Sequence, residues 1–301
     1  MPEPIAFLGI GNLGLPMATN LLKAGYPVVA FDPSAERLAL LAQRGAQAAR
    51  HGADAVREAG VVVTMVPSGK ELRQVFFDDG VLAAARPGTL FIDCSTVDTE
   101  SARHVKQAAH AAGHMMVDAP VSGGSVRAEQ ATLTIMVGAT DEAFARARPV
   151  LAAMASVVRH LGPEGTGLLA KICNNMIAGV TQVAVSEAFV LARQLGLDTQ
   201  QFFEVVANSS GQCWAVTTNC PVPGPVPSSP ANFDYRPGGA ATMLQKDLSL
   251  AQAAAREAGV PIPMATQALS LYTQLCDSGL GHLDVSAIIK LYSPVHTPAP
   301  K

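Results

Sequence analysis

Short apolar runs alternate with segments of helical periodicity through the first half of the chain. Apolar runs at residues 5–8, 26–31, 61–66, 89–93, 114–119, 133–137 and 157–161 predict buried strands. Helical patterns lie between them at residues 15–25, 35–45, 53–59, 70–77, 99–112 and 141–154. Strands that alternate with helices predict an α/β fold, in which a doubly wound parallel sheet carries helices on both faces.

The second half of the chain has a different pattern. Residues 167–195 form one long apolar stretch of helical composition, which is too long for an ordinary crossover between strands. Helical patterns follow at residues 199–209, 243–258, 263–278 and 285–291, and residues 221–239 are rich in proline, glycine and serine. We therefore expect two domains: a doubly wound domain over residues 1–164 and an all-helical domain over residues 165–301, with the long helix between them.

A glycine motif stands where the first predicted strand ends and the first helix begins. It reads Gly9-Ile10-Gly11-Asn12-Leu13-Gly14. Gly9 permits a tight turn, Gly11 leaves room for a pyrophosphate against bare backbone, and Gly14 lets the helix and strand pack closely. The helix N-terminus offers unpaired N–H groups to the phosphates. These residues predict a dinucleotide-binding loop.

Asp32 ends the second apolar run, 18 residues after Gly14. A carboxylate at this point accepts hydrogen bonds from both ribose hydroxyls of the dinucleotide. It also repels the additional phosphate of NADP, so the pattern predicts NAD as cofactor.

Three loops follow predicted strands at the edge where ligands of doubly wound sheets bind. The first is Val66-Pro67-Ser68, the second is Cys94-Ser95-Thr96, and the third covers residues 119–124 and contains Ser122, Gly123 and Gly124. Met65, Val66 and Pro67 are expected to contact the cofactor. A serine hydroxyl followed by two glycines exposes consecutive backbone N–H groups, which makes an anion-sized cup. A plain β-turn without a ligand is the alternative interpretation of the third loop.

The long apolar helix carries a lysine and two asparagines on one face. Lys171, Asn174 and Asn175 occupy positions i, i+3 and i+4 among apolar neighbours. A lysine is costly in such a setting unless it is used, and desolvation lowers the pKa of a lysine toward neutrality. Lys171 is therefore predicted to exchange a proton with a substrate hydroxyl. A lysine that extends from an interface helix to solvent is the alternative.

Two further features could belong to a site. Lys246 and Asp247 form a charged pair that reads most simply as a solvated helix turn. Trp214, the single tryptophan, suggests either core packing or the wall of a substrate pocket. No metal site is predicted, because Gly113 should end the helix between His110 and His114. The available chemistry is then hydride transfer, with a nicotinamide as redox partner and a lysine as proton partner.

Composition narrows the partners and the compartment. Hydrophobic residues make up 49% and charged residues 15% of the chain, an apolar surplus that suggests a buried subunit interface and hence a homodimer or homotetramer. A net charge of −3 gives no indication of nucleic acid binding, and no window offers an uninterrupted apolar stretch of about 20 residues for a membrane span. The five cysteines form no C-x-x-C pair, which fits reduced thiols in a cytoplasmic protein.

Taken together and in order, these motifs resemble the β-hydroxyacid dehydrogenase family over nearly the whole chain, most closely its hydroxyisobutyrate branch. The matching stretches are residues 7–22, Asp93-Cys94-Ser95-Thr96, Asp118-Ala119-Pro120-Val121-Ser122-Gly123-Gly124, residues 167–175 and residues 246–252. The resemblance implies a Rossmann domain followed by a helical domain around a long shared helix, with oligomers that form through the helical domain.

The resemblance also implies roles for individual residues. Lys171 matches the catalytic lysine that accepts the hydroxyl proton, and the Ser122–Gly124 loop matches the cup for the substrate carboxylate. Among the substrate contacts, Asn175 would orient substrate, with Asn174 beside it, and Trp214 and Asp247 would line the pocket. Thr96 resembles a residue that bridges cofactor and substrate, and Lys246 resembles a lysine that contacts the cofactor.

Two departures from the family pattern bear on substrate choice. Asn219-Cys220-Pro221 replaces a Tyr-Asn-Pro sequence, and Gly238-Gly239-Ala240 replaces Gly-Gly-Phe. Both changes reduce the aromatic lining of the expected pocket. We expect oxidation of 3-hydroxyisobutyrate to methylmalonate semialdehyde with NAD, as in valine degradation. The alternative substrates are L-serine, glycerate (with tartronate semialdehyde as its partner in the reaction) and 4-hydroxybutyrate. The alternative from another class is a protein that binds NAD without catalysis.

Overall fold

The computed structural model describes residues 2–292, and its contacts divide the chain into two compact units, residues 1–171 and 172–301. The end of the predicted helical domain, residues 293–301, lies outside the described residues. The division between the units falls within one continuous helix, α9 (Thr166–Gln194).

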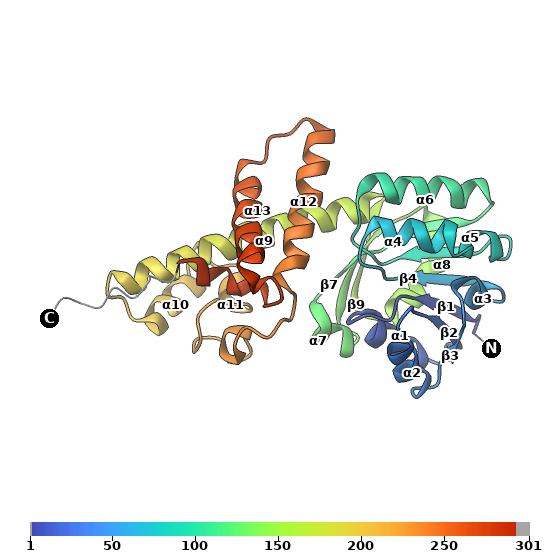
Figure 1. The fold of residues 1–301 in the computed structure, drawn as a ribbon, viewed down its shortest axis with the longest axis horizontal. Coiled ribbons are helices and arrows are strands. Elements are labelled where there is room, and N and C mark those ends of the chain that lie inside the picture. The colour runs from blue at the N-terminus through green and yellow to red at the C-terminus, as the bar shows by residue number, and fades with distance from the viewer. Residues whose placement is uncertain (1, 293–301) are drawn as a thin grey trace. The chain divides into compact units, whose positions relative to one another are not determined.

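The first unit is built on a twisted sheet (Figure 1). Its strands in the described residues are β1 (Ile5–Leu8), β2 (Val28–Phe31), β3 (Gln47–Ala48), β4 (Val61–Thr64), β5 (Leu90–Asp93), β6 (Met115–Asp118), β7 (Val121–Ser122), β8 (Leu133–Gly138) and β9 (Ala155–Gly162). Their order is β3-β2-β1-β4-β5-β6-β8-β7, with β9 paired to β8. The chain moves outward from β1 to β3 and then returns to β4 on the other side of β1. This reversal is the point at which doubly wound sheets bind ligands.

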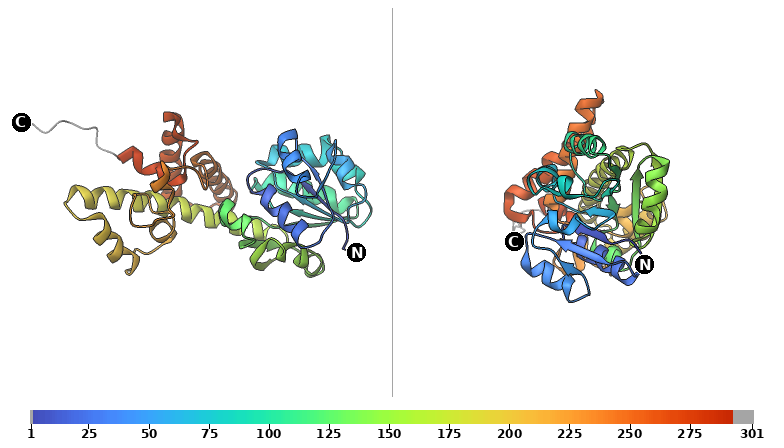
Figure 2. Two further views of the ribbon diagram at one scale, coloured as in Figure 1. Left: turned by 90° about the horizontal axis from the view of Figure 1, so that it is seen from below. Right: turned by 90° about the vertical axis from the view of Figure 1, so that its right-hand side faces the viewer.

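Helices cover both faces of this sheet, as Figures 1 and 2 show. They are α1 (Gly14–Lys23), α2 (Ala35–Ala42), α3 (Gly52–Val56), α4 (Gly69–Arg73), α5 (Val81–Ala84), α6 (Thr99–Ala111), α7 (Gly124–Glu129) and α8 (Asp141–Ala152), with a π-helical turn at Gln74–Asp78. Strands β1, β4 and β5 are buried along their whole length. Burial on both faces explains why they read as continuous apolar runs in the sequence. The doubly wound α/β fold is confirmed.

The sheet departs from the expected parallel arrangement at one side. Strand β8 runs antiparallel to β6, where Asp118 pairs with Gly138, and antiparallel to β7. The loop expected at residues 119–124 therefore contains strand β7, and helix α7 begins at its last glycine. Two-residue strands such as β3 and β7 are defined by their pairing with other strands. They are too short for local periodicity to predict them.

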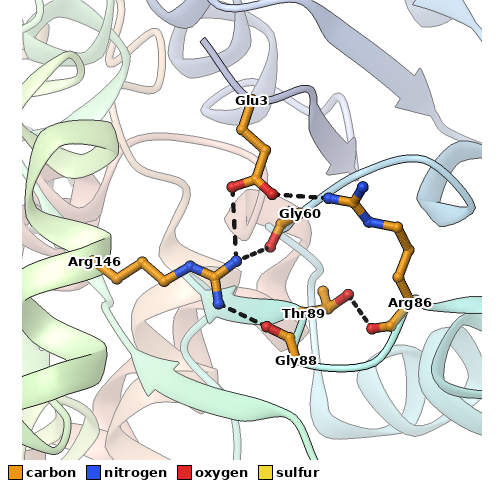
Figure 3. Close-up of polar contacts among 6 residues, drawn as sticks. All are labelled: Glu3, Gly60, Arg86, Gly88, Thr89 and Arg146. Carbon is orange, nitrogen blue, oxygen red and sulfur yellow. Dashed lines mark hydrogen bonds and ion pairs between the residues drawn. The ribbon is translucent and has the colours of Figure 1, made fainter.

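A polar cluster ties the amino ends of three neighbouring strands together (Figure 3). Arg146 of α8 donates from Nη1 to the carbonyl of Gly88, at 2.6 Å, and from Nη2 to the carbonyl of Gly60, at 2.9 Å. Glu3 accepts from Arg86 at 2.8 Å and lies 3.6 Å from Arg146. The contacts hold the segments that lead into β1, β4 and β5, at the end of the sheet away from the predicted binding loops.

The second unit is helical. It contains most of α9, followed by α10 (Thr199–Ala207), α11 (Trp214–Thr217), α12 (Ala241–Ala258) and α13 (Pro263–Leu275), with 3-10 turns at Pro230–Phe233 and Val285–Tyr292 and a π-helical turn at Cys276–Leu280. One apolar cluster joins α12 and α13 around Leu248, Tyr272 and Ile288. A second cluster packs Phe189 of α9 against Val216 of α11. The long helix and the irregular segment before α12 agree with the sequence expectation.

Among the described residues, α9 is the one helix long and apolar enough to cross a membrane, by length and composition alone. Its best window has a mean hydropathy of 1.4, and 39% of that window is buried. One such helix is weak evidence, because the core helix of a soluble protein passes the same test. The sequence expectation concerned uninterrupted apolar runs. Helix α9 is not such a run, because it contains Asn174, Asn175 and Gln182.

Candidate active site

The glycine loop after β1 has the close contacts that its three glycines predict. Gly9 has φ +98°, and a Cβ added there would lie 2.2 Å from the carbonyl oxygen of Met65. A Cβ on Gly14 would lie 2.0 Å from the carbonyl oxygen of Gly9. At Gly11, by contrast, nothing lies within 4 Å of an added Cβ. The open backbone at Gly11, at the start of α1, fits a pyrophosphate group.

Asp32 lies directly against this loop. Its Oδ2 accepts a hydrogen bond from the Ile10 N–H at 2.6 Å, and its Oδ1 accepts one from the Ser34 N–H at 2.8 Å. The Asn12 side chain accepts from Arg37 at 2.9 Å. The two ends of the predicted nucleotide site, loop and carboxylate, are therefore together, as binding of an NAD ribose requires.

The loops after β4 and β5 are held together by a buried network. The Val66 N–H donates to Ser95 Oγ at 2.9 Å. Asp93 accepts from Thr64 Oγ1 at 2.8 Å and from the Ser95 N–H at 3.1 Å. Burial raises the pKa of Asp93. The network supports the loops that carry Met65, Val66 and Pro67 on one strand and Thr96 on the next.

Asp93 was not predicted as a member of the site, and Ser95 was predicted only as part of the loop that follows its strand. The signal available in the sequence was an acid at the end of an apolar strand, followed within two residues by a hydroxyl side chain. That pattern does not reveal the partners across the sheet, since Thr64 is 29 residues away.

The Ser122–Gly124 loop joins β7 to α7 in a conformation that requires glycine. Gly123 has φ +137° and Gly124 has φ +69°, both in the region that side chains disfavour. A Cβ on Gly123 would also lie 2.8 Å from Cβ of Arg127. Two successive positive-φ residues after a serine shape a backbone concavity suited to a carboxylate.

Lys171 lies in the second turn of α9 and is 9% exposed. The neighbouring Leu168 and Ile172 are each 3% exposed. The apolar environment expected around this lysine is therefore present in part, since Leu169 and Ile177 are 47% and 60% exposed, and little of the lysine itself contacts water. Asn174 and Asn175 follow on the next turn of the same helix.

The helical unit brings four predicted residues into one chain of contacts. Asn174 Nδ2 donates to Asn175 Oδ1 at 3.1 Å, and Asn175 Nδ2 donates to Asp247 Oδ2 at 2.6 Å. Lys246 Nζ lies 3.4 Å from Asp247 Oδ1. Asp247 is only 5% exposed, so a solvated helix turn does not describe it. We call these four residues the α9–α12 polar relay.

Trp214 begins α11 and is 47% exposed, which excludes the core-packing interpretation. Its exposed indole remains available for contact with a ligand or another protein surface.

The two departures from the family pattern share a buried partner that the sequence did not indicate. Asp284, 1% exposed, accepts hydrogen bonds from the Asn219 side chain at 3.0 Å and from the Gly238 and Gly239 N–H groups at 3.0 and 3.2 Å. Asn219 also hydrogen-bonds to Gln182 of α9 at 3.3 Å. These hydrogen bonds explain structurally why asparagine, rather than an aromatic residue, occupies position 219.

Comparison with protein families agrees with this architecture. Residues 4–162 match the NAD binding domain of 6-phosphogluconate dehydrogenase. Residues 165–292 match a domain described as the NAD-binding domain of NADP-dependent 3-hydroxyisobutyrate dehydrogenase. The two matches cover the sheet unit with its glycine loop and the helical unit with its polar relay.

Known relatives are similar over almost their full length. The chain is 48% identical over 285 residues to a probable 3-hydroxyisobutyrate dehydrogenase of Mycobacterium tuberculosis, covering 95% of this chain and 96% of the relative. It is 43% identical to an NAD-dependent L-serine dehydrogenase of Pseudomonas aeruginosa, covering 97% and 98% of the two chains. A solved structure of Mycobacterium tuberculosis 3-hydroxyisobutyrate dehydrogenase with L-serine has a TM-score of 0.93 at 46% identity, and covers 98% of this chain and 100% of that chain.

The fold, the glycine loop with its acid and these relatives lead to one assignment of family and cofactor. The chain belongs to the 3-hydroxyisobutyrate dehydrogenase family, and it is an NAD-dependent oxidoreductase.

Proposed function

We propose that this enzyme oxidises 3-hydroxyisobutyrate to methylmalonate semialdehyde with NAD, and that Lys171 accepts the hydroxyl proton. The observation that carries the proposal is the burial of Lys171, at 9% exposure, one helical turn before the asparagine pair of the polar relay. Burial of a lysine costs free energy, and buried ionisable groups gather at functional sites, so a buried lysine in a predicted site is a candidate for proton transfer.

Residues of the first unit would hold the cofactor. The Gly9–Gly14 segment receives the pyrophosphate, and the Asp32 carboxylate accepts hydrogen bonds from the ribose. Met65, Val66, Pro67 and Thr96, on loops braced by Ser95 and Asp93, would line the rest of this edge. Bound NAD supplies the acceptor for the hydride that leaves the carbinol carbon.

The remaining groups would bind and orient the substrate. Ser122, Gly123 and Gly124 receive the carboxylate, because hydroxyl and backbone N–H donors suit an anion. Lys171 in its neutral form takes the proton from the substrate hydroxyl as oxidation proceeds. Asn175 donates to Asp247 in the relay, which fixes the asparagine for substrate contact, with Lys246 beside the carboxylate.

L-Serine is the second candidate substrate, and a specific observation favours it. A Pseudomonas aeruginosa relative at 43% identity is an NAD-dependent L-serine dehydrogenase, and the similar Mycobacterium tuberculosis structure holds L-serine. Serine and 3-hydroxyisobutyrate share a carboxylate and a primary hydroxyl on the β-carbon. Glycerate also carries a carboxylate and a primary hydroxyl on the β-carbon but differs in its other substituent. In 4-hydroxybutyrate the primary hydroxyl is one carbon further from the carboxylate. A protein that binds NAD without catalysis is the alternative outside this class.

Initial rates of NADH formation test the assignment. The four acids are compared at mildly alkaline pH, each with NAD and with NADP. We expect the highest kcat/KM for 3-hydroxyisobutyrate with NAD. A higher value for L-serine would reassign the substrate within the same chemistry, and tight NAD binding without turnover of any acid would contradict an enzymatic role.

The assembly and boundaries also form part of this proposal. We propose a dinucleotide-binding domain at residues 1–164 and a helical domain at residues 165–301, in agreement with the two family matches. The helical domain exposes Leu191, Leu195 and Val205 by 60–73%, which supports a homodimer or homotetramer. The five cysteines are free, which is consistent with a cytoplasmic location.

A further inference from the structure

Helix α9 begins without a side-chain cap from its own segment. The residue before its first helical position is Gly165, which has φ +98° and no side chain. The first N–H groups of a helix have no partner within the helix, so they need acceptors from elsewhere. The position of this first turn bears on the proposed site, because Lys171 lies in the next turn of the same helix.

The acceptor comes from the end of strand β6. Asp118 Oδ1 accepts a hydrogen bond from the Gly165 N–H at 2.5 Å, and Asp118 Oδ2 accepts one from the Leu168 N–H at 2.8 Å. Leu168 is the third residue of α9, the position that an N-cap side chain ordinarily serves. A carboxylate 47 and 50 residues away in sequence thus does the work of a local cap.

Two glycines allow the helix start and the carboxylate to approach so closely. A Cβ on Gly167 would lie 2.4 Å from the carbonyl oxygen of Met136 and 2.8 Å from that of Asp118. A Cβ on Gly138 would lie 2.6 Å from Asp118 Oδ1. The first turn of α9 is therefore seated against β6 and β8 by backbone contact as well as by hydrogen bonds.

The same strand end leads directly into the substrate loop. Only Ala119 and the stiff Pro120 separate Asp118 from β7, which ends at Ser122. Lys171 follows Leu168 by three residues on α9. Asp118 therefore connects the strand that delivers the carboxylate cup to the helical turn that precedes the lysine, all within the first unit.

We propose that Asp118 is a positioning residue of this enzyme, which sets Lys171 relative to the Ser122–Gly124 loop by anchoring the first turn of α9. The inference rests on the proposed role of Lys171. Asp118 itself touches neither substrate nor cofactor in this account. Its burial raises its pKa while the two N–H groups oppose that rise, so the hydrogen bonds favour the ionised form that anchors the helix.

The test compares Asp118→Ala, Asp118→Asn and a matched control, Asp198→Asn. Asp198 caps α10 by accepting from the Gln201 N–H at 2.9 Å, and lies outside the proposed machinery. For each variant, kcat and KM are measured with 3-hydroxyisobutyrate and with L-serine. The NAD dissociation constant is measured by calorimetry, and rates are expressed per NAD-binding site, so that partly unfolded protein does not distort them.

We expect Asp118→Ala to lower kcat about 10- to 100-fold, because a small displacement of a catalytic group is enough for such a loss. KM should change less than kcat, and NAD affinity should stay within about twofold, since the cup and the glycine loop are intact. Asp118→Asn keeps one oxygen acceptor and should retain more of kcat than Asp118→Ala. Asp198→Asn should leave kcat unchanged.

The contrary result is a kcat within about twofold of the wild type in both Asp118 variants, with only a lower melting temperature, as expected of an ordinary helix cap. Lys171→Ala is measured in parallel to separate the two claims. Loss of activity in Lys171→Ala but not in the Asp118 variants would overturn this inference alone. Full activity in Lys171→Ala would overturn the proposed function itself.

Discussion

Individual polar side chains stand at the ends of adjacent strands and differ in burial. Asp93 and Asp118 end β5 and β6, and His114 stands immediately before β6 with 7% exposure. The imidazole packs edge-on against Phe91 at a centroid distance of 5.3 Å. Burial lowers the pKa of His114, because the charged form is poorly solvated there.

His114 should therefore make the folded protein less stable in mild acid. The unfolded chain binds a proton near the ordinary histidine pKa, whereas the folded chain resists protonation until lower pH. Stability is thus highest above that ordinary value and falls as the pH drops through it. We predict that His114→Phe reduces the decline in melting temperature between pH 7.5 and pH 5.5.

The exposed His51 supplies the control for this measurement, since His51→Gln should leave the decline unchanged. An equal decline in His114→Phe and wild type would show that other groups cause the acid sensitivity.

At this scale the sequence was informative where one residue conflicts with its neighbours. Lys171 could be singled out because a lysine among apolar residues of a helix is costly, and it is indeed buried. Asp118 and Asp284 could not be found in this way. Asp118 accepts from N–H groups 47 and 50 residues away, and Asp284 accepts from Asn219, Gly238 and Gly239, which lie 45–65 residues away, so these roles appear only in the folded chain.

Polar contacts between helices, strands and loops fix the amino ends of the sheet strands and the start of α9. Arg146 of α8 binds the carbonyls of Gly60 and Gly88 and lies beside Glu3 (Figure 3). A Cβ on Gly60 would lie 1.5 Å from Glu3 Oε1, so this corner is closely packed. The cluster braces the end of the sheet opposite the loops that would bind NAD.

Arg146→Ala should destabilise the first unit without affecting catalysis. The substitution removes a part-buried hydrogen bond to the Gly60 carbonyl and an exposed one to the Gly88 carbonyl. A hydrogen bond to a charged group is worth about 1.5–3 kcal/mol, and less where it is exposed to water. We predict a loss of about 2–4 kcal/mol in the free energy of unfolding, discounted from the sum because Arg146 is partly exposed. Urea denaturation measures this change.

Arg148→Ala, at an exposed position of the same helix, should change stability by less than about 0.5 kcal/mol. Equal stability of the two variants would contradict a structural role for the cluster in Figure 3.

Periodicity predicts long elements better than short ones. Strands β1, β4 and β5 and helix α9 were visible because burial on two faces leaves apolar runs. Strands β3 and β7 and the antiparallel placement of β8 were not visible, since pairing with other strands creates them.

For the whole molecule, the apolar surplus in the composition reappears as exposed side chains on the helical unit. Leu191 of α9 and Leu195 just after it are 60% and 73% exposed. They are four residues apart, which places them on one face. Val205 of α10 is 62% exposed. Side chains of this kind commonly become buried when subunits associate.

Leu191→Glu should therefore weaken self-association. We predict that light scattering after gel filtration gives a dimer or larger assembly for the wild type and a smaller species for the variant. Arg193→Gln, at an exposed position two residues further along the same helix and therefore on another face, should not change the mass. A wild-type monomer at micromolar concentration would contradict the proposed assembly.

Family, fold and cofactor were accessible from the sequence because five motifs stand in order along the whole chain. Substrate choice was not, since the chain departs from the family pattern around Asn219 and Gly239, where part of the pocket was expected. Asp284 explains how these loops are built, through its bonds to Asn219, Gly238 and Gly239.

The most direct test of the account is NAD-linked oxidation of 3-hydroxyisobutyrate by wild type and Lys171→Ala, with NAD affinity measured on the same preparations. We predict that Lys171→Ala lowers kcat at least about 100-fold, as expected for loss of a general base, while NAD binds with nearly unchanged affinity. Turnover close to that of the wild type would contradict the role of Lys171, and loss of NAD binding would identify it as a structural residue.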